Sequence, residues 1–478
     1  MIKKDKLISN MIFSGIFQLL FLLAPVVTTP YVARIFSAAD LGIYGTSYAV
    51  AMFFVQTASF GIPIFGSRKI AQTKGKEKKS SEFFNIWIIQ IVTSFISFVL
   101  FIIEIIFFEK SNQNIYLAQS LLVLINIFDV SWFYIGIEEI KKNILRNVAA
   151  KIITISCIFI FVNTKDDLFL YVAINVLGVL VGNLTMIFQL HHFILFDVKK
   201  KVPSKSYVFE SFGLLVPQGV DSAKNAISRL ILLRLSNYNE AGYFDQGLKI
   251  INMLNGILQS VTTAIIPRIT HLISIGDTQK VLNIMDGFLK MTTVISSVII
   301  SGVFAISEYF VPLFFGPGYN SIIIVMKIGS ISLLFLIISY FFGKGLLISL
   351  SKDKEFRIAT YLSSVSLLVT NLVLDNSFGA MGATVSLLIS SVVFTFVILS
   401  FLSEYVQKKK IFLEILYATS IIFVTTLAIE ILKLYIVINS NFLSLIVFGI
   451  FSVLISCIIL FITRKNNRAF FSQIFHHR

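Results

Sequence analysis

Long apolar stretches alternate with short polar connections along nearly the whole chain. A helix needs roughly 20 apolar residues to cross the hydrocarbon core of a bilayer, and a window of that length predicts about fourteen spans. The predicted spans are 10–34, 41–64, 83–108, 115–136, 144–163, 168–192, 209–234, 242–266, 287–311, 320–346, 357–375, 379–402, 411–436 and 441–463. This pattern predicts an all-α polytopic membrane protein without an extramembrane domain.

The composition narrows the class further. Charged residues make up 14% of the chain and hydrophobic residues 56%, whereas soluble domains carry about a quarter charged residues. The net charge is +15, but the basic residues are spread among short loops, so no nucleic-acid partner is expected. Cys157 and Cys457 lie in apolar runs, and the paired histidines lack carboxylate or cysteine neighbours at ligand spacing. We therefore predict no metal site and no cofactor.

The loop charges predict the orientation in the membrane. With the amino terminus inside, the inner loops hold roughly 29 Lys and Arg residues and the outer loops roughly five. Since basic residues favour the cytoplasmic side, both termini are expected on the cytoplasmic side of the membrane. Lipids are the expected surroundings of the helices.

The chain also repeats itself with a shift of 200 residues. Identical residues recur in the pairs Gln18 and Gln218, Arg34 and Arg234, Gly42 and Gly242, and Arg68 and Arg268. The two copies are six spans apart, an even number, so they form parallel repeats related by an axis along the membrane normal. We expect an amino-terminal lobe at 1–208, a second six-helix lobe at 209–405, and two additional spans with a tail at 406–478. Two such lobes make a complete transport pathway, so a monomer is expected.

Several segments resemble one family of transporters. They are the run from Asn10 to Gly42 with Thr29-Pro30-Tyr31-Val32-Ala33-Arg34, then Phe60-Gly61-Ile62-Pro63, Arg68-Lys69-Ile70-Ala71, Ser131 to Glu138, Gly242 to Lys249, and Ile265-Ile266-Pro267-Arg268. From about residue 5 to about 460 the chain resembles bacterial polysaccharide flippases, the O-antigen and capsular-repeat translocases of the multidrug/oligosaccharidyl-lipid/polysaccharide exporter superfamily. The resemblance implies that an undecaprenyl-pyrophosphate-linked oligosaccharide moves from the inner to the outer leaflet.

The seventh predicted span holds the strongest chemical signal. Asp221 and Lys224 lie near the middle of this span and Arg229 in its outer third. Three such residues facing lipid would cost roughly 7–10 kcal/mol, and the helical period places them on one broad stripe. Arg229 and Lys224 are therefore candidate ligands of a substrate diphosphate. Asp221 is a candidate partner of Lys224 or a carrier of a coupling proton or sodium ion. The alternative is an ion-pair network that ties helices together.

Weaker candidates lie in other spans. Asp245 and Lys249 are four residues apart, which suits a cavity wall or an ordinary intrahelical pair. Asp129 is a second candidate for ion coupling or a helix-bridging carboxylate. Pro25 and Pro217 lie in the first helix of each lobe and are candidate hinges or static kinks. Lys151, Lys290 and Lys327 are within about two turns of predicted helix ends and are expected to reach the headgroups.

Other functions remain open. A multidrug or other lipid exporter of the same superfamily is the first alternative, although acidic residues would be expected to dominate a cavity for cationic drugs. A membrane polysaccharide polymerase or glycosyltransferase is the second, but no large outer loop or acidic metal cluster is evident in the sequence. We therefore expect that the chain is not an enzyme. The absence of a Walker-type loop in the sequence also argues against ATP hydrolysis.

Overall fold

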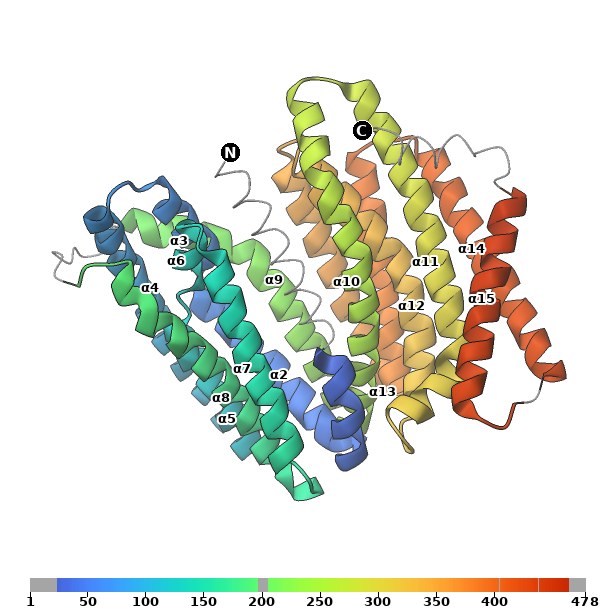
Figure 1. Cartoon of the computed structure of the whole chain (residues 1–478), viewed down its shortest axis with the longest axis horizontal. Coiled ribbons are helices and arrows are strands. Elements are labelled where there is room, and N and C mark those ends of the chain that lie inside the picture. Colours follow the sequence, from blue (N-terminus) through green and yellow to red (C-terminus); the bar gives the residue numbers. More distant parts are fainter. Residues whose placement is uncertain (1–23, 197–204, 404, 437, 464–478) are drawn as a thin grey trace. The chain divides into compact units, whose positions relative to one another are not determined.

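The computed structural model describes residues 24–196, 205–403, 405–436 and 438–463 (Figure 1). Its contacts divide the chain into two compact units, Met1–Gly242 and Tyr243–Arg478. All regular elements in the described ranges are helical, as the alternation of apolar stretches predicts.

Unit 1 consists of long helices and shorter helical pieces. After a helical segment at 24–35, its elements are α2 (Ala38–Ser59), α3 (Ile62–Gln72), α4 (Lys76–Phe108), α5 (Gln113–Ile125), η1 (Asn126–Phe128), α6 (Ser131–Gly136), α7 (Ile140–Phe161), η2 (Lys165–Asp167), α8 (Leu168–Gln189), η3 (Leu190–His192) and α9 (Lys205–Leu235). Each predicted span from 41–64 to 209–234 coincides with one of these helices or with two or three consecutive ones. The first predicted span lies mostly outside the described residues.

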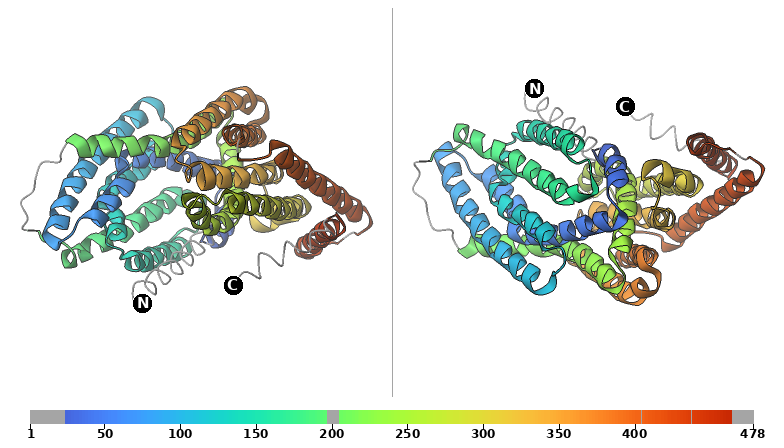
Figure 2. Two further views of the ribbon diagram at one scale, coloured as in Figure 1. Left: turned by 90° about the horizontal axis from the view of Figure 1, so that it is seen from above. Right: turned by 90° about the horizontal axis from the view of Figure 1, so that it is seen from below.

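The boundary between the two units lies within α10 (Tyr238–Ser274), whose first residues belong to unit 1 and whose remaining residues belong to unit 2. The elements that follow are α11 (Thr278–Phe314), α12 (Ser321–Tyr340), the π-helical η4 (Phe341–Leu347), α13 (Asp353–Phe401), α14 (Lys408–Tyr435) and α15 (Asn441–Thr463). Helices α14 and α15 pack on α11 and on each other and lie at the edge of unit 2 in all views (Figures 1 and 2).

Helix α13 contains two predicted spans, 357–375 and 379–402. Gly379 has φ 51° and ψ −130°, a backbone conformation outside the helical region that glycine adopts at low cost. The chain reverses direction there. The backbone after the reversal lies close to the backbone before it: a Cβ on Gly382 would be 2.5 Å from the carbonyl oxygen of Leu374. Further along, the Ser390 hydroxyl donates to the Ser363 carbonyl at 2.8 Å. The two halves therefore pack antiparallel, as two separate spans must.

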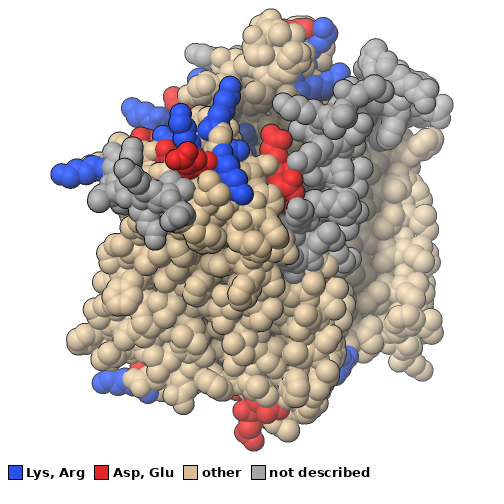
Figure 3. Space-filling view, turned by 60° about the vertical axis from the view of Figure 1, so that its left-hand side comes forward, with Lys and Arg blue, Asp and Glu red and all other residues tan. Residues whose placement is uncertain are grey.

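Nine helices in the described ranges are long and apolar enough to cross a membrane, and a tenth qualifies if the bent α10 counts as one span. Helix α9 is not among the nine, and α7 contributes only a shorter apolar stretch, 147–161. Both helices carry basic residues in their middle. On the face in Figure 3, which brings unit 1 forward, charged side chains gather along two margins with a broad uncharged band between them. This distribution is typical of a multi-pass membrane protein.

Polar side chains hold the predicted fourth span together where its helix breaks. Between α5 and α6 the helical ladder is interrupted at η1, and free carbonyl groups need partners. Gln90 of α4 donates its amide to the carbonyls of Asn126, at 2.5 Å, and Asp129, at 2.9 Å. The same side chain accepts a hydrogen bond from the Trp132 indole at 2.9 Å. One buried glutamine therefore satisfies both sides of the break.

The motif Phe60-Gly61-Ile62-Pro63 also marks a break, between α2 and α3. Phe60 and Gly61 both have positive φ, 51° and 73°, so the α2 helix ends there in a left-handed turn. Pro63 then falls in the first turn of α3, where the missing N–H group costs nothing. The residue types of this motif are therefore explained by the backbone conformation at the break between α2 and α3.

Candidate functional site

Helix α9 positions the two cations of the predicted diphosphate site. Ala226, Ser228 and Leu232 of this helix are buried, and α9 packs against α2 within unit 1. Lys224 and Arg229 are half-buried. The Arg229 guanidinium donates through Nη1 to the Asn225 carbonyl, one turn earlier, at 3.2 Å. Lys224 lies 11 residues before the helix end at Leu235 and Arg229 six, so both are well inside α9.

Two predicted residues of the same helix fall outside what is described. The side chains of Asp221 and Pro217 belong to a part of α9 that has no described side-chain positions. Pro25 is half-buried in the helical segment 24–35, but the turn before it lies outside the described residues. The pairing of Asp221 with Lys224 and the hinge roles of both prolines remain predictions.

Asp245 and Lys249 form the expected i,i+4 pair in α10. The Lys249 ammonium lies 3.7 Å from Asp245 Oδ2 and donates to Gln246 Oε1 at 3.2 Å. Asp245 is buried and the Lys249 side chain is about one-third exposed. Gln246 is fully buried beside them. The pair belongs to unit 2, whereas Lys224 and Arg229 belong to unit 1.

Asp129 lies at the break between η1 and α6. Its Oδ1 accepts a hydrogen bond from the Ser131 backbone N–H at 3.0 Å, which satisfies one of the free donors at the start of α6. The geometry gives Asp129 a capping contact. A role in ion coupling stays a prediction.

A second buried carboxylate, which the sequence did not single out, lies in α13. Asp375 has no exposed surface, and neither have Asn371, one turn earlier, and Thr384 on the returning half of the helix. The Thr384 hydroxyl donates to the Ala380 carbonyl at 2.7 Å, directly after the reversal at Gly379. A carboxylate within a membrane helix usually marks an ion or proton path. In the sequence, the signal that could have identified Asp375 is its position as the one acidic residue of the predicted span 357–375.

A bend in α10 was also missed. The segments Tyr238–Ser260 and Ile265–Ser274 differ in direction by 43°. Pro267 lies inside α10, in the first turn of the second segment, and a proline removes the hydrogen bond to the residue four positions earlier. The predicted span ended at 266, so this proline was not considered as a candidate hinge.

The three lysines that were expected to reach the headgroups have other surroundings in the structure. Lys290 pairs with Asp286 at 2.9 Å and Lys327 with Glu308 at 2.6 Å. Lys151 lies 11 residues after Ile140 and ten before Phe161, in the middle of α7. The expectation that Lys151 lies within two turns of a helix end was therefore wrong, because α7 begins four residues earlier than the predicted span.

An ion-pair network joins α14 to the rest of unit 2. Glu308 of α11 binds Lys433 of α14 at 2.9 Å in addition to Lys327 of α12. Lys433 also binds Glu430 at 2.9 Å and lies over the Tyr309 ring, 5.5 Å from its centroid. These contacts tie the peripheral α14 to α11 and, through Glu308, to α12.

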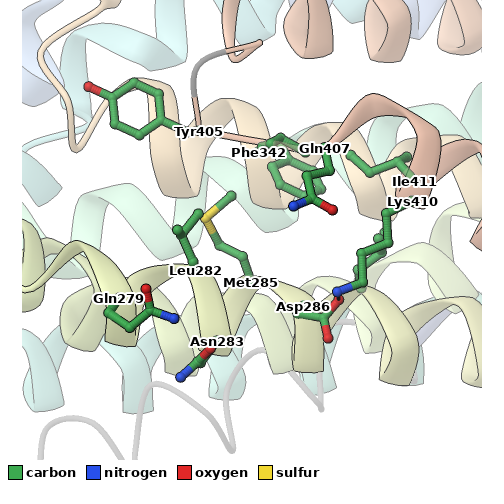
Figure 4. Close-up of a pocket in the computed structure, with 12 residues that line it drawn as sticks. Gln279, Leu282, Asn283, Met285, Asp286, Phe342, Tyr405, Gln407, Lys410 and Ile411 are labelled. Carbon is green, nitrogen blue, oxygen red and sulfur yellow. Dashed lines mark ion pairs between the residues drawn. The ribbon is translucent and has the colours of Figure 1, made fainter.

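A pocket of about 360 Å³ lies at the other end of α11 (Figure 4). Lys410 of α14 and Asp286 of α11 point toward each other in it, with Nζ and Oδ1 2.6 Å apart. Because Lys290 pairs with the second oxygen of Asp286, the carboxylate is shared by two cations. This arrangement joins α14 to α11 a second time.

The fold is similar to that of solved transporters. It is similar to the lipid II flippase MurJ in an inward closed conformation, with a TM-score of 0.68 and 16% identity over 96% of this chain and 100% of that chain. It is also similar to an inward-facing multidrug resistance MATE family transporter of the MOP superfamily, with a TM-score of 0.62 and 12% identity over 86% and 95%. The class is thus a polytopic helical membrane protein with the fold of these two transporters.

The sequence comparisons name the family within this class. The chain belongs to the family described as polysaccharide biosynthesis protein, which matches residues 7–273. It is 24% identical over 405 residues to a putative O-antigen transporter of Escherichia coli (strain K12). This alignment covers 82% of this chain and 95% of that protein. The predicted resemblance is confirmed, and these relatives are transporters and a flippase, not enzymes.

Proposed function

We propose that the chain is a flippase that carries an undecaprenyl-pyrophosphate-linked oligosaccharide repeat unit from the inner to the outer leaflet. One observation carries the proposal: a chain of the polysaccharide biosynthesis family has the fold of a lipid II flippase along that protein's entire length. The relative described as a putative O-antigen transporter supports the same substrate class.

Lys224 and Arg229 are the proposed ligands of the pyrophosphate. A diphosphate cannot cross hydrocarbon without cations, and guanidinium and ammonium groups bind phosphate oxygens strongly. Both residues are half-buried on α9, so part of each side chain is accessible to a ligand. Asp245 and Lys249 of α10 are proposed to contact the same substrate.

Alternating access is the proposed mechanism. The lobes of this cycle are residues 1–208 and 209–405, with 406–478 as an addition outside the duplicated part. Parallel repeats of this kind move against each other as nearly rigid bodies around a central site. Pro25 and Pro217 are the proposed hinges, and the bend before Pro267 in α10 is a third.

Coupling to a proton or a sodium ion is proposed to drive the cycle, alone or with the membrane potential. Asp221 and Asp129 are the candidates from the sequence. Asp375 is a third, because it is fully buried in a membrane helix, one turn from the equally buried Asn371. Oxygen ligands of this type suit a hard monovalent cation, and a buried carboxylate also binds a proton readily.

The proposed location is the bacterial inner membrane with both termini in the cytoplasm. The excess of basic residues in the predicted inner loops supports this orientation. A monomer suffices for the cycle, because one chain contains both halves of the pathway.

The decisive experiment uses cells that lack the gene for this chain. A flippase predicts that lipid-linked oligosaccharide repeat units accumulate on the cytoplasmic side, and that the intact gene restores the surface polysaccharide. Normal surface polysaccharide and no accumulation in the deletion strain would refute the proposal. Identification of the accumulated sugar by mass spectrometry would define the substrate.

A multidrug exporter is the second candidate, favoured by the similarity to a MATE family transporter. It predicts altered sensitivity to cationic toxins without accumulation of a lipid-linked sugar. The basic residues of α9 argue against it, because a cavity for cationic drugs requires acidic side chains. A polymerase would instead leave single repeat units at the cell surface.

A further inference from the structure

The pocket between α11 and α14 lies at the edge of the predicted hydrocarbon region. Asp286 directly precedes the predicted span 287–311, and Lys410 directly precedes the predicted span 411–436. Both residues line the pocket, and both belong to unit 2. Charged side chains at the end of a membrane span lie at the level of the lipid headgroups. We therefore expect this pocket to be within reach of a headgroup.

The pocket has a polar part and an apolar part. Three polar lining residues are exposed and lie outside the predicted spans: Gln279, Asn283 and Gln407. Three apolar lining residues are buried and lie inside the predicted spans: Leu289, Phe342 and Ile411. A ligand with a polar end and an apolar end matches both parts, because each part of the pocket would then contact groups of its own polarity.

Lys410 has hydrogen-bonding capacity beyond its ion pair. An ammonium group has three N–H donors, and the one partner of Lys410 Nζ among the described residues is Asp286 Oδ1, at 2.6 Å (Figure 4). Asp286 is also bound by Lys290 at 2.9 Å, so its charge does not depend on Lys410 alone. The Lys410 side chain is 47% exposed. Its remaining N–H groups are therefore accessible to a second anion.

The start of α14 adds positive charge on the same side of the pocket. Three consecutive lysines begin this helix: Lys408, Lys409 and Lys410. Its first turn contains no acidic residue, although acidic side chains are the ones that the positive end of a helix dipole favours. Gln407 precedes the helix, and its side chain makes no capping hydrogen bond. A phosphate group beside Lys410 would supply the missing negative charge and accept from the Gln407 amide.

The helix surface that follows Lys410 favours a lipid over a soluble phosphate. Phe412, Leu413 and Leu416 of α14 are all exposed, as expected for side chains that contact acyl chains. Basic pockets between membrane helices on the cytoplasmic side bind anionic headgroups, because the lysines attract the negative lipids of that leaflet. In the proposed orientation the starts of α11 and α14 face the cytoplasm.

We propose that this pocket binds the headgroup of one anionic phospholipid of the inner leaflet. Lys410 contributes the cation for the lipid phosphate, and Gln407 contributes an amide donor. The acyl chains extend along the exposed apolar surface of α14. The leaflet follows from the proposed orientation of the chain, but the site itself does not depend on the flippase activity.

Native mass spectrometry of the purified, delipidated full-length protein tests the proposal. We expect phosphatidylglycerol to bind saturably, with about one lipid per chain. Phosphatidylcholine with the same acyl chains should bind about tenfold more weakly, because its headgroup has no net charge. Rising salt should reduce this preference, since it screens the attraction between the lysines and the phosphate.

Glycerol phosphate distinguishes a lipid site from a site for a soluble phosphate. It has the headgroup chemistry of phosphatidylglycerol without acyl chains, so it should displace the lipid only at far higher concentrations. Displacement at equal concentrations would overturn the assignment to a lipid.

Matched variants connect the binding to the pocket. Lys410→Met should weaken binding of phosphatidylglycerol about tenfold and Gln407→Leu several-fold, whereas Lys410→Arg should retain it because the charge is kept. Lys354→Met, at an exposed position near the start of α13, should bind like the wild type. Equal binding of the two lipids by the wild type, or unchanged binding by folded Lys410→Met, would overturn the proposal.

The Lys410 variants should keep α14 in place. Lys433 binds Glu308 of α11 at the far end of α14, and the Thr293 hydroxyl of α11 donates to Glu414 Oε2 of α14 at 3.2 Å. Size-exclusion profiles and thermal midpoints establish that each variant is folded. Gln407→Leu leaves the ion pair of Lys410 with Asp286 intact, so a loss of lipid binding in this variant does not arise from a detached helix.

Discussion

Gly42 of α2 and Gly242 of α10 meet backbone to backbone within unit 1. A Cβ on Gly42 would overlap the carbonyl oxygen of Tyr238, and one on Gly242 would overlap the carbonyl oxygen of Ala38. Each glycine thus lies against the carbonyl four residues before the other. Since the two glycines correspond in the 200-residue repeat, this reciprocal contact has the symmetry expected where a local twofold axis passes between two copies.

Substitution of either glycine tests this contact. Gly42→Ala and Gly242→Ala should each destabilise the protein by about 3 kcal/mol, because backbone atoms cannot move aside as flexible side chains can. The thermal midpoint of the purified protein measures the change. Gly302→Ala in α11 is the matched control, since a Cβ there meets nothing within 4 Å, and it should stabilise by about 0.5–1 kcal/mol. Equal midpoints for all three variants would contradict the contact.

Arg229→Ala tests the diphosphate site. We expect translocation of the lipid-linked oligosaccharide to be lost, with normal amounts of protein in the membrane, because removal of the guanidinium leaves the diphosphate with Lys224 as the one remaining cation of α9 proposed to bind it. Arg229→Lys should retain part of the activity, since it keeps the charge but loses the planar fork. The measurements are surface polysaccharide and accumulated precursor in complemented deletion cells.

The control for Arg229 is Lys110→Ala, at an exposed position between α4 and α5. Its translocation should match the wild type. If folded Arg229→Ala protein translocates normally, the assignment of this residue to the substrate is wrong.

Gln90→Leu tests the polar support of the helix break. The change removes the donor to Asn126 and Asp129 and the acceptor of Trp132. Because buried polar groups without partners cost about 1–3 kcal/mol each, we expect a loss of about 3 kcal/mol in the free energy of unfolding. Gln113→Leu, whose amide donates to Glu109 at the exposed start of α5, should lose less than about 1 kcal/mol. A similar small loss for both variants would show that the break is held by other contacts.

Lys433→Met tests the attachment of α14. The lysine side chain is only 10% exposed and binds both Glu308 and Glu430, so its removal brings two carboxylates together without their shared cation. We expect a loss of about 1–3 kcal/mol and faster proteolysis between α14 and α15. Glu430→Gln, at the more exposed end of the network, should have a smaller effect. Unchanged proteolysis in Lys433→Met would indicate that apolar packing alone holds α14.

The stability at low pH should depend on Asp277, before α11. Hydrogen bonds from Lys280 to this carboxylate lower the pKa of Asp277 below its usual 3.8. Stabilisation from a lowered pKa is present above the unfolded value and disappears as the pH falls through the folded value. Asp277→Asn keeps a capping oxygen without the charge. The difference in thermal midpoint between wild type and variant should therefore be constant from pH 7 to about 5 and vanish at lower pH, and a constant difference down to about pH 2 would contradict the linkage.

The sequence by itself determined the helical membrane class, the extents of most spans, the 200-residue repeat and the family. These features follow from local properties: hydropathy along a stretch of about 20 residues is enough to define a span, and residues that recur at a fixed distance are visible without coordinates. The cations of α9 were also found this way, because a lysine or arginine in an apolar stretch is conspicuous wherever it faces. The hydropathy also predicted that the segment of α13 is two spans, with a break between residues 375 and 379, and the structure has its non-helical backbone at Gly379.

Only the tertiary structure decided which polar residues share a neighbourhood. Gln90 and Trp132, or Glu308 and Lys433, lie on different helices, and their proximity depends on how those helices pack and rotate. The hydropathy of each helix does not specify its rotation when both faces are apolar, so these pairs could not be inferred from the chain alone. The burial of Asp375 and the reciprocal contact of Gly42 with Gly242 arise in the same way, from backbones that approach closely only after the helices have assembled.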